Sequence, residues 1–312
     1  MPPPIKVYFH GTGGSTPFNF RNMPCISLKY EQYLIQFDFG EYCQYGLLRG
    51  GIHPFRSITY ILLTHFHADH VGGLPGFLHT YSLISNQRRL TIVGPAGLRG
   101  FINGILGLFG IENLVHRINL IEIDSERIEY TRVVEEKNFE IYAFRTEHGV
   151  PSIGYIFAEK NWKKFNEEKA KKLGIPPGPI RGRLINGQEI KIHGKTIKPE
   201  QVVDIIKGRK IIYTGDTKIT PSIIKYYEGA DLLIHDATYL KAKHQKYADE
   251  RGHSTIEDIC EIAKKMSVKT LALVHLSPRY QKELEEIKDL INEFMGNKTK
   301  IIIPDDGDII VL

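Results

Sequence analysis

Short apolar runs, each closed by glycine or polar residues, recur along this chain. The runs Ile58–Leu63 and Thr270–Val274 are apolar and β-branched over most of their length, which is typical of strands buried on both faces. By the same criterion we expect further strands at residues 5–9, 26–30, 33–37, 90–93, 120–123, 139–144, 210–214, 232–234 and 300–303.

Between these runs, apolar residues recur at helical spacing. This pattern predicts helices at residues 74–88, 97–110, 256–266 and 281–294. Ser254, followed three residues later by Glu257, is expected to cap the third of them as a capping box. A Lys-rich segment, Asn161–Leu173, is also expected to be helical. At 312 residues the chain could form one large domain or two small ones.

The strand at Ile58–Leu63 is followed closely by three histidines and a carboxylate. These are His65, His67, Asp69 and His70. Nitrogen and oxygen donors that converge where a buried strand ends suit a borderline divalent metal, because they can bind it without rearranging the core. A polar loop that merely happens to be rich in histidine is the alternative.

Polar residues also follow other predicted strands. Asp38 follows the strand at 33–37 and could orient a ligand histidine or serve only as a turn residue before Gly40. His148 follows the strand at 139–144, where a lone histidine is as often structural as a ligand. Asp216, Asp236 and His275 end three later strands. His253 precedes a helix, in a loop position where catalytic groups are often held.

Positive charge is concentrated in one insertion. Residues 159–210 contain fourteen Lys or Arg against six acids, a net charge of +8, while the whole chain is +5. Residues 174–179, GIPPGP, cannot form regular structure. The insertion is either a solvated loop or an arm that binds phosphates.

The remaining composition excludes several classes of protein. Cys25, Cys43 and Cys260 are odd in number and have no CxxC spacing, which argues against a disulfide framework and a cysteine zinc site. The longest apolar stretch, residues 100–111, is interrupted by glycine and too short to span a bilayer. The first residues do not form a signal-peptide pattern. These features predict a cytoplasmic protein without a membrane partner.

The HxHxDH motif after a hydrophobic strand resembles the signature of the metallo-β-lactamase superfamily. The resemblance implies an α/β fold, an αβ/βα sandwich of two mixed sheets, and two zinc ions per subunit. The expected ligands are His65, His67 and His148 for one ion, Asp69, His70 and His275 for the other, and Asp216 as a bridge. Asp38 would then orient a ligand histidine.

Further motifs resemble those of the ribonuclease Z family across essentially the whole chain. They are FDFGE at 37–41, HGVPSIGY at 148–155, IPPGP in the insertion, YTGDT at 213–217, HDATY at 235–239, GHST at 252–255 and HLSPRY at 275–280. The resemblance implies a zinc-dependent endoribonuclease that removes the 3′ trailer from precursor tRNA. It would leave a 3′-hydroxyl on the tRNA and a 5′-phosphate on the trailer, and would act as a homodimer.

The same resemblance assigns roles to individual residues. Asp69 would accept a proton, and His253, paired with Asp236, would help the 3′-oxygen leave. Residues 1–312 would form a single domain, from which residues 159–208 protrude as a flexible tRNA-binding arm. The expected RNA contacts are Arg21, Asn22, Arg279, Lys171, Lys172 and Arg181.

Two positions depart from the family pattern. Asp236 stands where the family usually has Glu, and Asn19 replaces a basic residue in the loop at 17–22. The shorter Asp236 leaves its reach to His253 open. A small-molecule hydrolase of the superfamily, such as a thioesterase or lactonase, is the alternative function, but it has no use for a +8 arm. A non-catalytic RNA-binding protein would not need the metal ligands.

Overall fold

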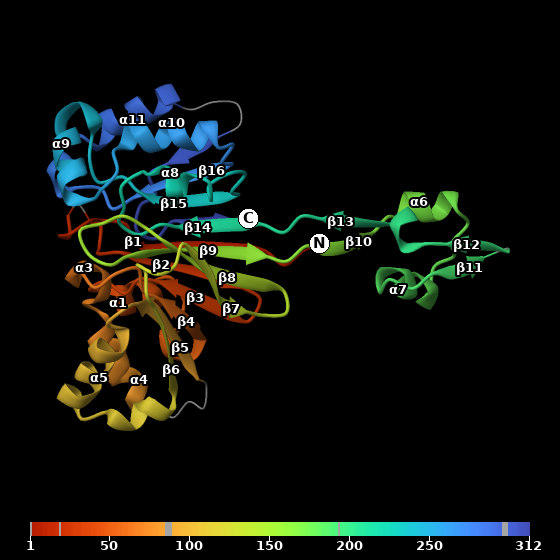
Figure 1. The fold of residues 1–312 in the computed structure, drawn as a ribbon, viewed down its shortest axis with the longest axis horizontal. Coiled ribbons are helices and arrows are strands. Elements are labelled where there is room, and N and C mark those ends of the chain that lie inside the picture. Colours follow the sequence, from red (N-terminus) through yellow and green to blue (C-terminus); the bar gives the residue numbers. More distant parts are fainter. Residues whose placement is uncertain (1, 19, 85–88, 193, 295–298) are drawn as a thin grey trace.

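Two seven-stranded mixed sheets pack face to face at the centre of the molecule (Figure 1). The computed structural model describes residues 2–18, 20–84, 89–192, 194–294 and 299–312. In spatial order the first sheet contains β18 (Ile309–Val311), β1 (Ile5–Gly11), β2 (Cys25–Tyr30), β3 (Tyr33–Phe37), β4 (Ile58–Leu62), β5 (Leu90–Pro95) and β6 (Ile118–Ile123). The second contains β17 (Lys300–Ile302), β16 (Thr270–Val274), β15 (Leu232–Asp236), β14 (Lys210–Tyr213), β9 (Ile153–Glu159), β8 (Phe139–Arg145) and β7 (Tyr130–Glu135).

Each sheet is antiparallel on one side and parallel on the other. Strands β3 to β6 are parallel to one another, as are β14 to β17. Parallel strands end at the same edge of a sheet, so the residues that follow them are brought together there. All the predicted strands are present, whereas β7 and β18 were not predicted.

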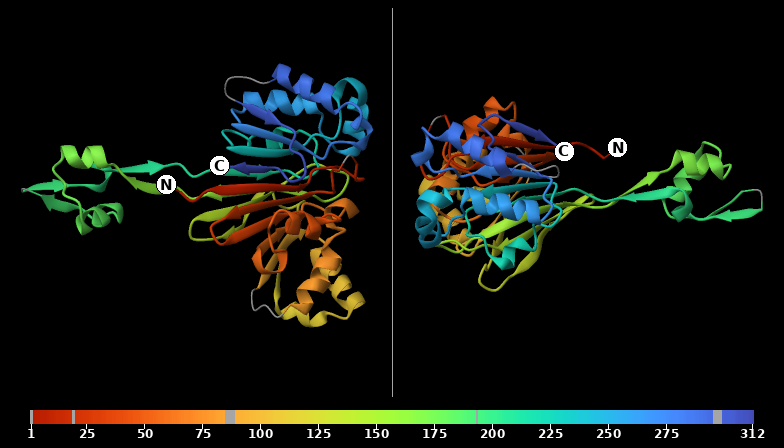
Figure 2. Two further views of the ribbon diagram at one scale, coloured as in Figure 1. Left: turned by 180° about the vertical axis from the view of Figure 1, so that it is seen from behind. Right: turned by 90° about the horizontal axis from the view of Figure 1, so that it is seen from above.

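Helices cover the outer face of each sheet, so the sandwich has four layers (Figures 1 and 2). The first sheet is covered by helices from the N-terminal half, and the second by helices from the C-terminal half. The former are α1 (Cys43–Arg49), α2 (Pro54–Ser57), α3 (Ala68–Val71), α4 (Leu74–Leu83), α5 (Leu98–Phe109) and η1 (Glu112–His116). The latter are α8 (Pro221–Ile224), α9 (Lys241–Arg251), α10 (Ile256–Lys265), η3 (Pro278–Tyr280) and α11 (Leu284–Phe294).

Three apolar cores hold these layers together. The central core lies between the sheets and includes Phe9, Phe37, Tyr155 and Phe157, all at most 1% exposed. The other two join each sheet to its helices. This arrangement confirms the predicted α/β sandwich of two mixed sheets. Among the described residues, no helix combines the length and the apolar character needed to cross a bilayer.

The basic insertion projects from the sandwich as a folded arm (Figure 2). A two-stranded antiparallel stalk, β10 (Trp162–Phe165) and β13 (Val203–Ile206), leads to its tip. The tip contains α6 (Glu167–Lys172), α7 (Pro179–Ile185), β11 (Ile190–Ile192), β12 (Lys195–Ile197) and η2 (Pro199–Gln201). It has a core of its own, which includes Ala170, Leu184 and Val202, each 0% exposed.

Three local predictions were wrong. The segment predicted as one helix, Asn161–Leu173, begins as strand β10, because its residues pair with β13 about forty positions later. The cap of α10 is Thr255, whose Oγ1 accepts from Asp258 N–H, whereas Ser254 donates to the Thr217 carbonyl. Cys25 and Cys43 are joined in a disulfide, and Cys260 is the free thiol.

Candidate metal centre

The predicted metal ligands converge at the edge where the parallel strands of both sheets end. His65 and His67 follow β4, His70 lies on α3, and Asp216 follows β14. Gly215, at φ 60°, makes the turn that delivers Asp216, and a Cβ there would lie 2.6 Å from Thr64. A side chain at this position would therefore force β4 and β14 apart at the point where they build the site.

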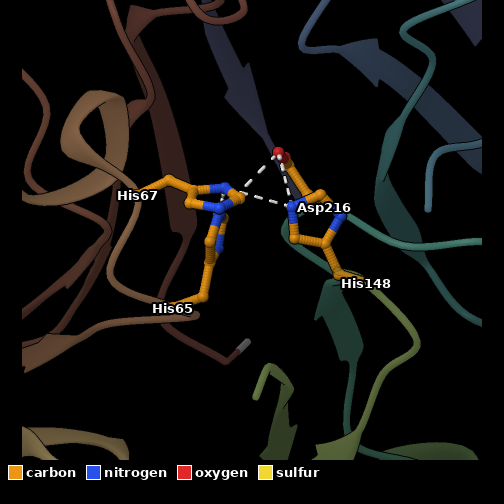
Figure 3. A group of neighbouring side chains, drawn as sticks. All are labelled: His65, His67, His148 and Asp216. Atoms are coloured by element: carbon orange, nitrogen blue, oxygen red, sulfur yellow. Dashed lines mark hydrogen bonds and ion pairs between the residues drawn. The ribbon is translucent and has the colours of Figure 1, made fainter. Parts of the chain in front are cut away.

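One group of ligands is formed by three imidazoles and a carboxylate whose donor atoms face one another (Figure 3). His67 Nδ1 lies 3.0 Å from His65 Nε2 and 3.1 Å from His148 Nε2. The Asp216 Oδ2 atom is 3.9 Å from Nε2 of both His65 and His148. The four donor atoms lie within 4.8 Å of one another, a spacing that a single cation can bridge.

A second group lies on the other side of Asp216. It consists of Asp69, His70 and His275, whose donor atoms also lie within 4.8 Å of one another. Asp216 Oδ1 is 3.3 Å from His70 Nε2, and Asp216 Oδ2 is 3.3 Å from His275 Nε2. The Asp216 carboxylate therefore faces both groups, as a bridging ligand would.

Two atoms of this cluster are buried without a hydrogen-bond partner, namely His70 Nε2 and Asp216 Oδ1. Unpaired buried polar atoms are costly, so each such atom needs a physical explanation. Burial disfavours charge on His70, but the carboxylates of Asp216 and Asp38 outweigh it and raise its pKa well above the usual range. The pocket therefore has negative charge that a cation would neutralise, and its donor set fits a divalent metal.

Asp38 holds the His70 ring from behind, as the sequence predicted for it. Its Oδ2 lies 2.7 Å from His70 Nδ1 and accepts from the Tyr213 hydroxyl at 2.7 Å. Its carboxylate also accepts from the Thr64 backbone N–H at 2.8 Å. With Nδ1 fixed in this way, His70 presents Nε2 to the centre. Tyr213 was missed by the sequence analysis, although its place at the end of the run Lys210–Thr214 could have indicated it.

Other ligand rings are oriented by similar contacts. His148 Nδ1 lies 2.9 Å from the Gly252 carbonyl oxygen, and His275 Nδ1 lies 2.8 Å from Thr238 Oγ1. The Thr238 hydroxyl in turn donates to Asp236 at 2.6 Å. Thr238 therefore connects a metal-ligand candidate to the Asp236 carboxylate, a role that the sequence analysis did not assign to it.

His253 and Asp236 form the pair that the sequence analysis left open. His253 Nδ1 lies 2.8 Å from Asp236 Oδ2, so the shorter carboxylate does reach the ring. Backbone N–H groups of Thr217 and Thr238 also donate to Asp236, which is 1% exposed. Burial disfavours the imidazolium, but Asp236 outweighs this effect and raises the pKa of His253 to about 9. Among the described residues, nothing hydrogen-bonds to His253 Nε2.

A pocket of about 500 Å³ opens over the centre. It is lined by Ser15, His67, Ala68, Asp69, His148, Asp216, Arg251, His253 and His275. A second hollow of about 540 Å³ lies beside it and shares His148. The proposed ligands, the proposed proton acceptor and His253 therefore face one space, which is large enough for a nucleotide.

The predicted RNA contacts are placed differently from one another. Arg21 is 3% exposed and donates to Thr12 Oγ1 and the Pro304 carbonyl, both at 2.6 Å, and to Asp305. Its guanidinium thus holds the glycine-rich loop against the C-terminal strand and is not presented to solvent. Asn22 donates to Asp306 through its backbone and its side chain. Asn19 lies outside the described residues.

The remaining predicted contacts are more accessible. Arg279 is exposed beside the pocket, and Lys171 and Lys172 are exposed at the tip of the arm. Arg181, in contrast, is bound within the arm, because it donates to Glu167 at 2.6 Å and to the Pro176 carbonyl at 3.0 Å. Its contacts are those of a residue that stabilises the arm.

Comparisons with known proteins agree with this geometry. Residues 201–276 match the family model described as beta-lactamase superfamily domain, and residues 5–164 match anti-Pycsar protein Apyc1. The chain is 34% identical over 304 residues to ribonuclease Z of Methanosarcina mazei, which covers 97% of this chain and 96% of the relative. It is 40% identical over 293 residues to ribonuclease Z of Pyrococcus abyssi, with 90% of each chain covered.

Among solved structures, human tRNase Z, short form, matches with a TM-score of 0.67 and 29% identity over 98% of both chains. The metallo-beta-lactamase fold protein YhfI from Bacillus subtilis matches with a TM-score of 0.68 and 17% identity over 99% of both chains. The second likeness shows the fold alone, and it supports the sandwich predicted from the HxHxDH motif.

Proposed function

The chain belongs to the ribonuclease Z family of the metallo-β-lactamase superfamily and is a hydrolytic endoribonuclease, and from this we propose how its centre removes the 3′ trailer from precursor tRNA. The observation that carries the proposal is the convergence of both ligand groups on one carboxylate, Asp216, beneath an open pocket. The products are a tRNA with a 3′-hydroxyl and a trailer with a 5′-phosphate.

The metal content that the donor set favours is two zinc ions. His65, His67 and His148 would hold one, Asp69, His70 and His275 the other, and Asp216 would contact both. Imidazole and carboxylate donors without cysteine fit zinc in a hydrolytic site. When bound, such ions act as Lewis acids on phosphoryl oxygens and lower the pKa of water.

The protein's own side chains would move the protons. Asp69 is a carboxylate at the pocket, and we assign it the proton of the attacking water. His253 is held by Asp236 through Nδ1 at 2.8 Å, which leaves Nε2 to protonate the departing ribose 3′-oxygen. An alkoxide leaves poorly, and general acid catalysis typically contributes about 10²–10⁴-fold.

The arm would bind the RNA and would not take part in the chemistry. It carries exposed lysines such as Lys171 and Lys172, and its own core lets it fold as a rigid attachment. Cationic side chains that neutralise phosphates supply affinity without sequence specificity. Arg279, exposed at the mouth of the pocket, would contact the end of the RNA that is cut.

An exposed aromatic patch supports a homodimer. Phe20 is 99% exposed, Tyr42 60%, Tyr45 64% and Leu48 47%, and the first three line one hollow of about 440 Å³. Large exposed apolar patches mark interaction sites. A second copy of the chain would cover this one, and we place the assembly in the cytoplasm, where precursor tRNA is available in a cell without a nucleus.

The proposal is tested with a precursor tRNA that carries a 3′ trailer. Zinc-loaded protein should cut it once and leave a 3′-hydroxyl, which ligation to a 5′-phosphorylated adaptor would detect. His65→Ala should lower the zinc content and abolish the cut. A variant His65→Ala that cuts at the normal rate would refute the metal assignment.

The role of His253 is tested by its leaving group. His253→Ala should lose cleavage of precursor tRNA while retaining its zinc. It should lose much less on bis(p-nitrophenyl) phosphate, whose phenolate leaves without a proton. Equal losses on the two substrates would show that His253 binds substrate or supports the fold, and that another group supplies the acid.

A further inference from the structure

Two arginines and two tyrosines form a ladder that leads away from the metal pocket along α9. The Arg279 guanidinium lies 5.9 Å from the centre of the Tyr239 ring and 5.8 Å from that of Tyr247. The Arg251 guanidinium lies 5.9 Å from the centre of the Tyr247 ring, on the same helix. The order is therefore Tyr239, Arg279, Tyr247 and Arg251, with the outer three members accessible to solvent.

The two guanidinium groups of this ladder are not neutralised. Among the described residues, neither Arg251 nor Arg279 makes an ion pair with a carboxylate. The acids on the neighbouring surface are engaged elsewhere, since Glu283 pairs with Lys243 and Glu250 with Lys246. At nearly 6 Å, the limit of a cation–π contact, each guanidinium is held loosely enough to turn towards an incoming phosphate.

Tyr247 is a supported but open surface. Its ring is 47% exposed and packs at 5.8 Å against the His244 ring, whose Nδ1 lies 2.6 Å from the Tyr280 hydroxyl oxygen. Tyr280 is 1% exposed, so this contact connects Tyr247 to the core. Aromatic rings held in this way beside cationic groups are the usual means of binding unpaired nucleotides.

The position of the ladder indicates which side of the cut it serves. The Tyr239 ring lies 5.7 Å from the His253 ring, and Arg251 lines the pocket over the metal ligands. His253 is proposed to protonate the 3′-oxygen that stays with the tRNA. The ladder begins beside His253, so it lies on the tRNA side of the cut.

We propose that this ladder binds the unpaired nucleotide immediately before the cut, with its base stacked on Tyr247 and its phosphates contacted by Arg251 and Arg279. This assignment rests on the proposed function and adds a specificity element to it. It makes Tyr247 a substrate-binding residue that acts on an unpaired RNA strand. The proposal therefore requires a base at this position of the substrate, whatever its identity.

A cycle of protein and substrate changes tests the stacking. For the wild type, an abasic nucleotide directly before the cut should lower kcat/KM by about 5- to 150-fold, the range for one stacked base. Tyr247→Leu should suffer a similar loss on the intact precursor, and the abasic change should then cost it little more. Tyr247→Phe, which keeps the aromatic ring, should retain the wild-type response.

Matched changes separate stacking from other causes. Arg251→Ala should raise KM for precursor tRNA, whereas Lys246→Ala, which removes an equally exposed charge from the same helix, should not. Normal kcat/KM in Tyr247→Leu would overturn the inference, as would independent, multiplying losses from the two changes. A wild-type protein that fails to cut precursor tRNA at all would instead refute the proposed function.

Discussion

The disulfide between Cys25 and Cys43 closes the stretch of chain that positions Asp38 behind His70. The two cysteines are separated by 18 residues, and they connect β2 to the first residue of α1. In the chain-entropy description, a loop of this length restricts the unfolded chain by about 3 kcal/mol. We therefore expect the double variant Cys25→Ser/Cys43→Ser to have a free energy of unfolding lower by about that amount.

This loss is measurable as a shift in the melting temperature. With an unfolding entropy of about 2.1 cal/mol/K per residue over 312 residues, about 3 kcal/mol corresponds to a Tm lower by about 5 °C. Calorimetry of the zinc-loaded protein should show this shift in the double variant, and also in the wild type after reduction. Cys260→Ala, which leaves the bond intact, should keep the full response to reductant.

Alkylation counts the thiols independently. Unfolded without reductant, the protein should react with iodoacetamide at Cys260 alone, and after reduction at all three cysteines. Three alkylated cysteines without reductant would refute the bond. A Tm that does not respond to reductant would refute the stabilisation inferred from it.

Three further predictions concern ligand positioning, RNA binding and the base of the arm. Asp38→Ala should weaken zinc binding by about 10–100-fold through loss of the contact to His70, measured by competition with a chelator. Replacing 161–207 with a short Gly-Ser linker should raise KM for precursor tRNA and flatten the salt dependence of binding, by about 0.9 in log–log slope per lost contact if the RNA behaves like duplex DNA; an unchanged slope would return the arm to a solvated loop. Burial disfavours the Glu159 carboxylate, but hydrogen bonds from Arg209 outweigh it and lower the pKa of Glu159, so its stabilisation is present above about pH 4.5 and lost as the pH falls further. Melting curves of Glu159→Gln should therefore fall less steeply than those of the wild type below this pH.

The centre could be predicted from the sequence because its signals are local. His65, His67, Asp69 and His70 lie within six positions, and the strand before them is apolar throughout. The ends of parallel strands must meet at one edge, so residues as distant as His275 could be placed with them. The same argument does not identify Tyr213 or Thr238, because neutral side chains that orient ligands resemble any other strand-end residue.

Pairings between distant segments account for the failures. Trp162 starts a strand because Ile206 pairs with it, and a window of a dozen residues around Trp162 contains only the Lys-rich pattern that suggested a helix. Cys25 and Cys43 likewise have no spacing motif, and only the packing of α1 against the first sheet brings their Cα atoms to 5.6 Å. Arg21 was expected to bind RNA because it is basic, whereas its partners come from the other end of the chain.

The placement of arm and centre argues for a long substrate. Strand β9 begins beside the centre, and its continuation into β10 carries the chain to residue 165 at the base of the arm's tip. At about 3.3 Å per residue, residues 153–165 separate the two by roughly 40 Å. A thioester or lactone cannot contact both ends, whereas a folded RNA can, or two protomers can share the two ends. The +8 charge at one end and the cluster of histidines at the other are therefore two parts of one macromolecular reaction, in which binding and cleavage can be impaired separately.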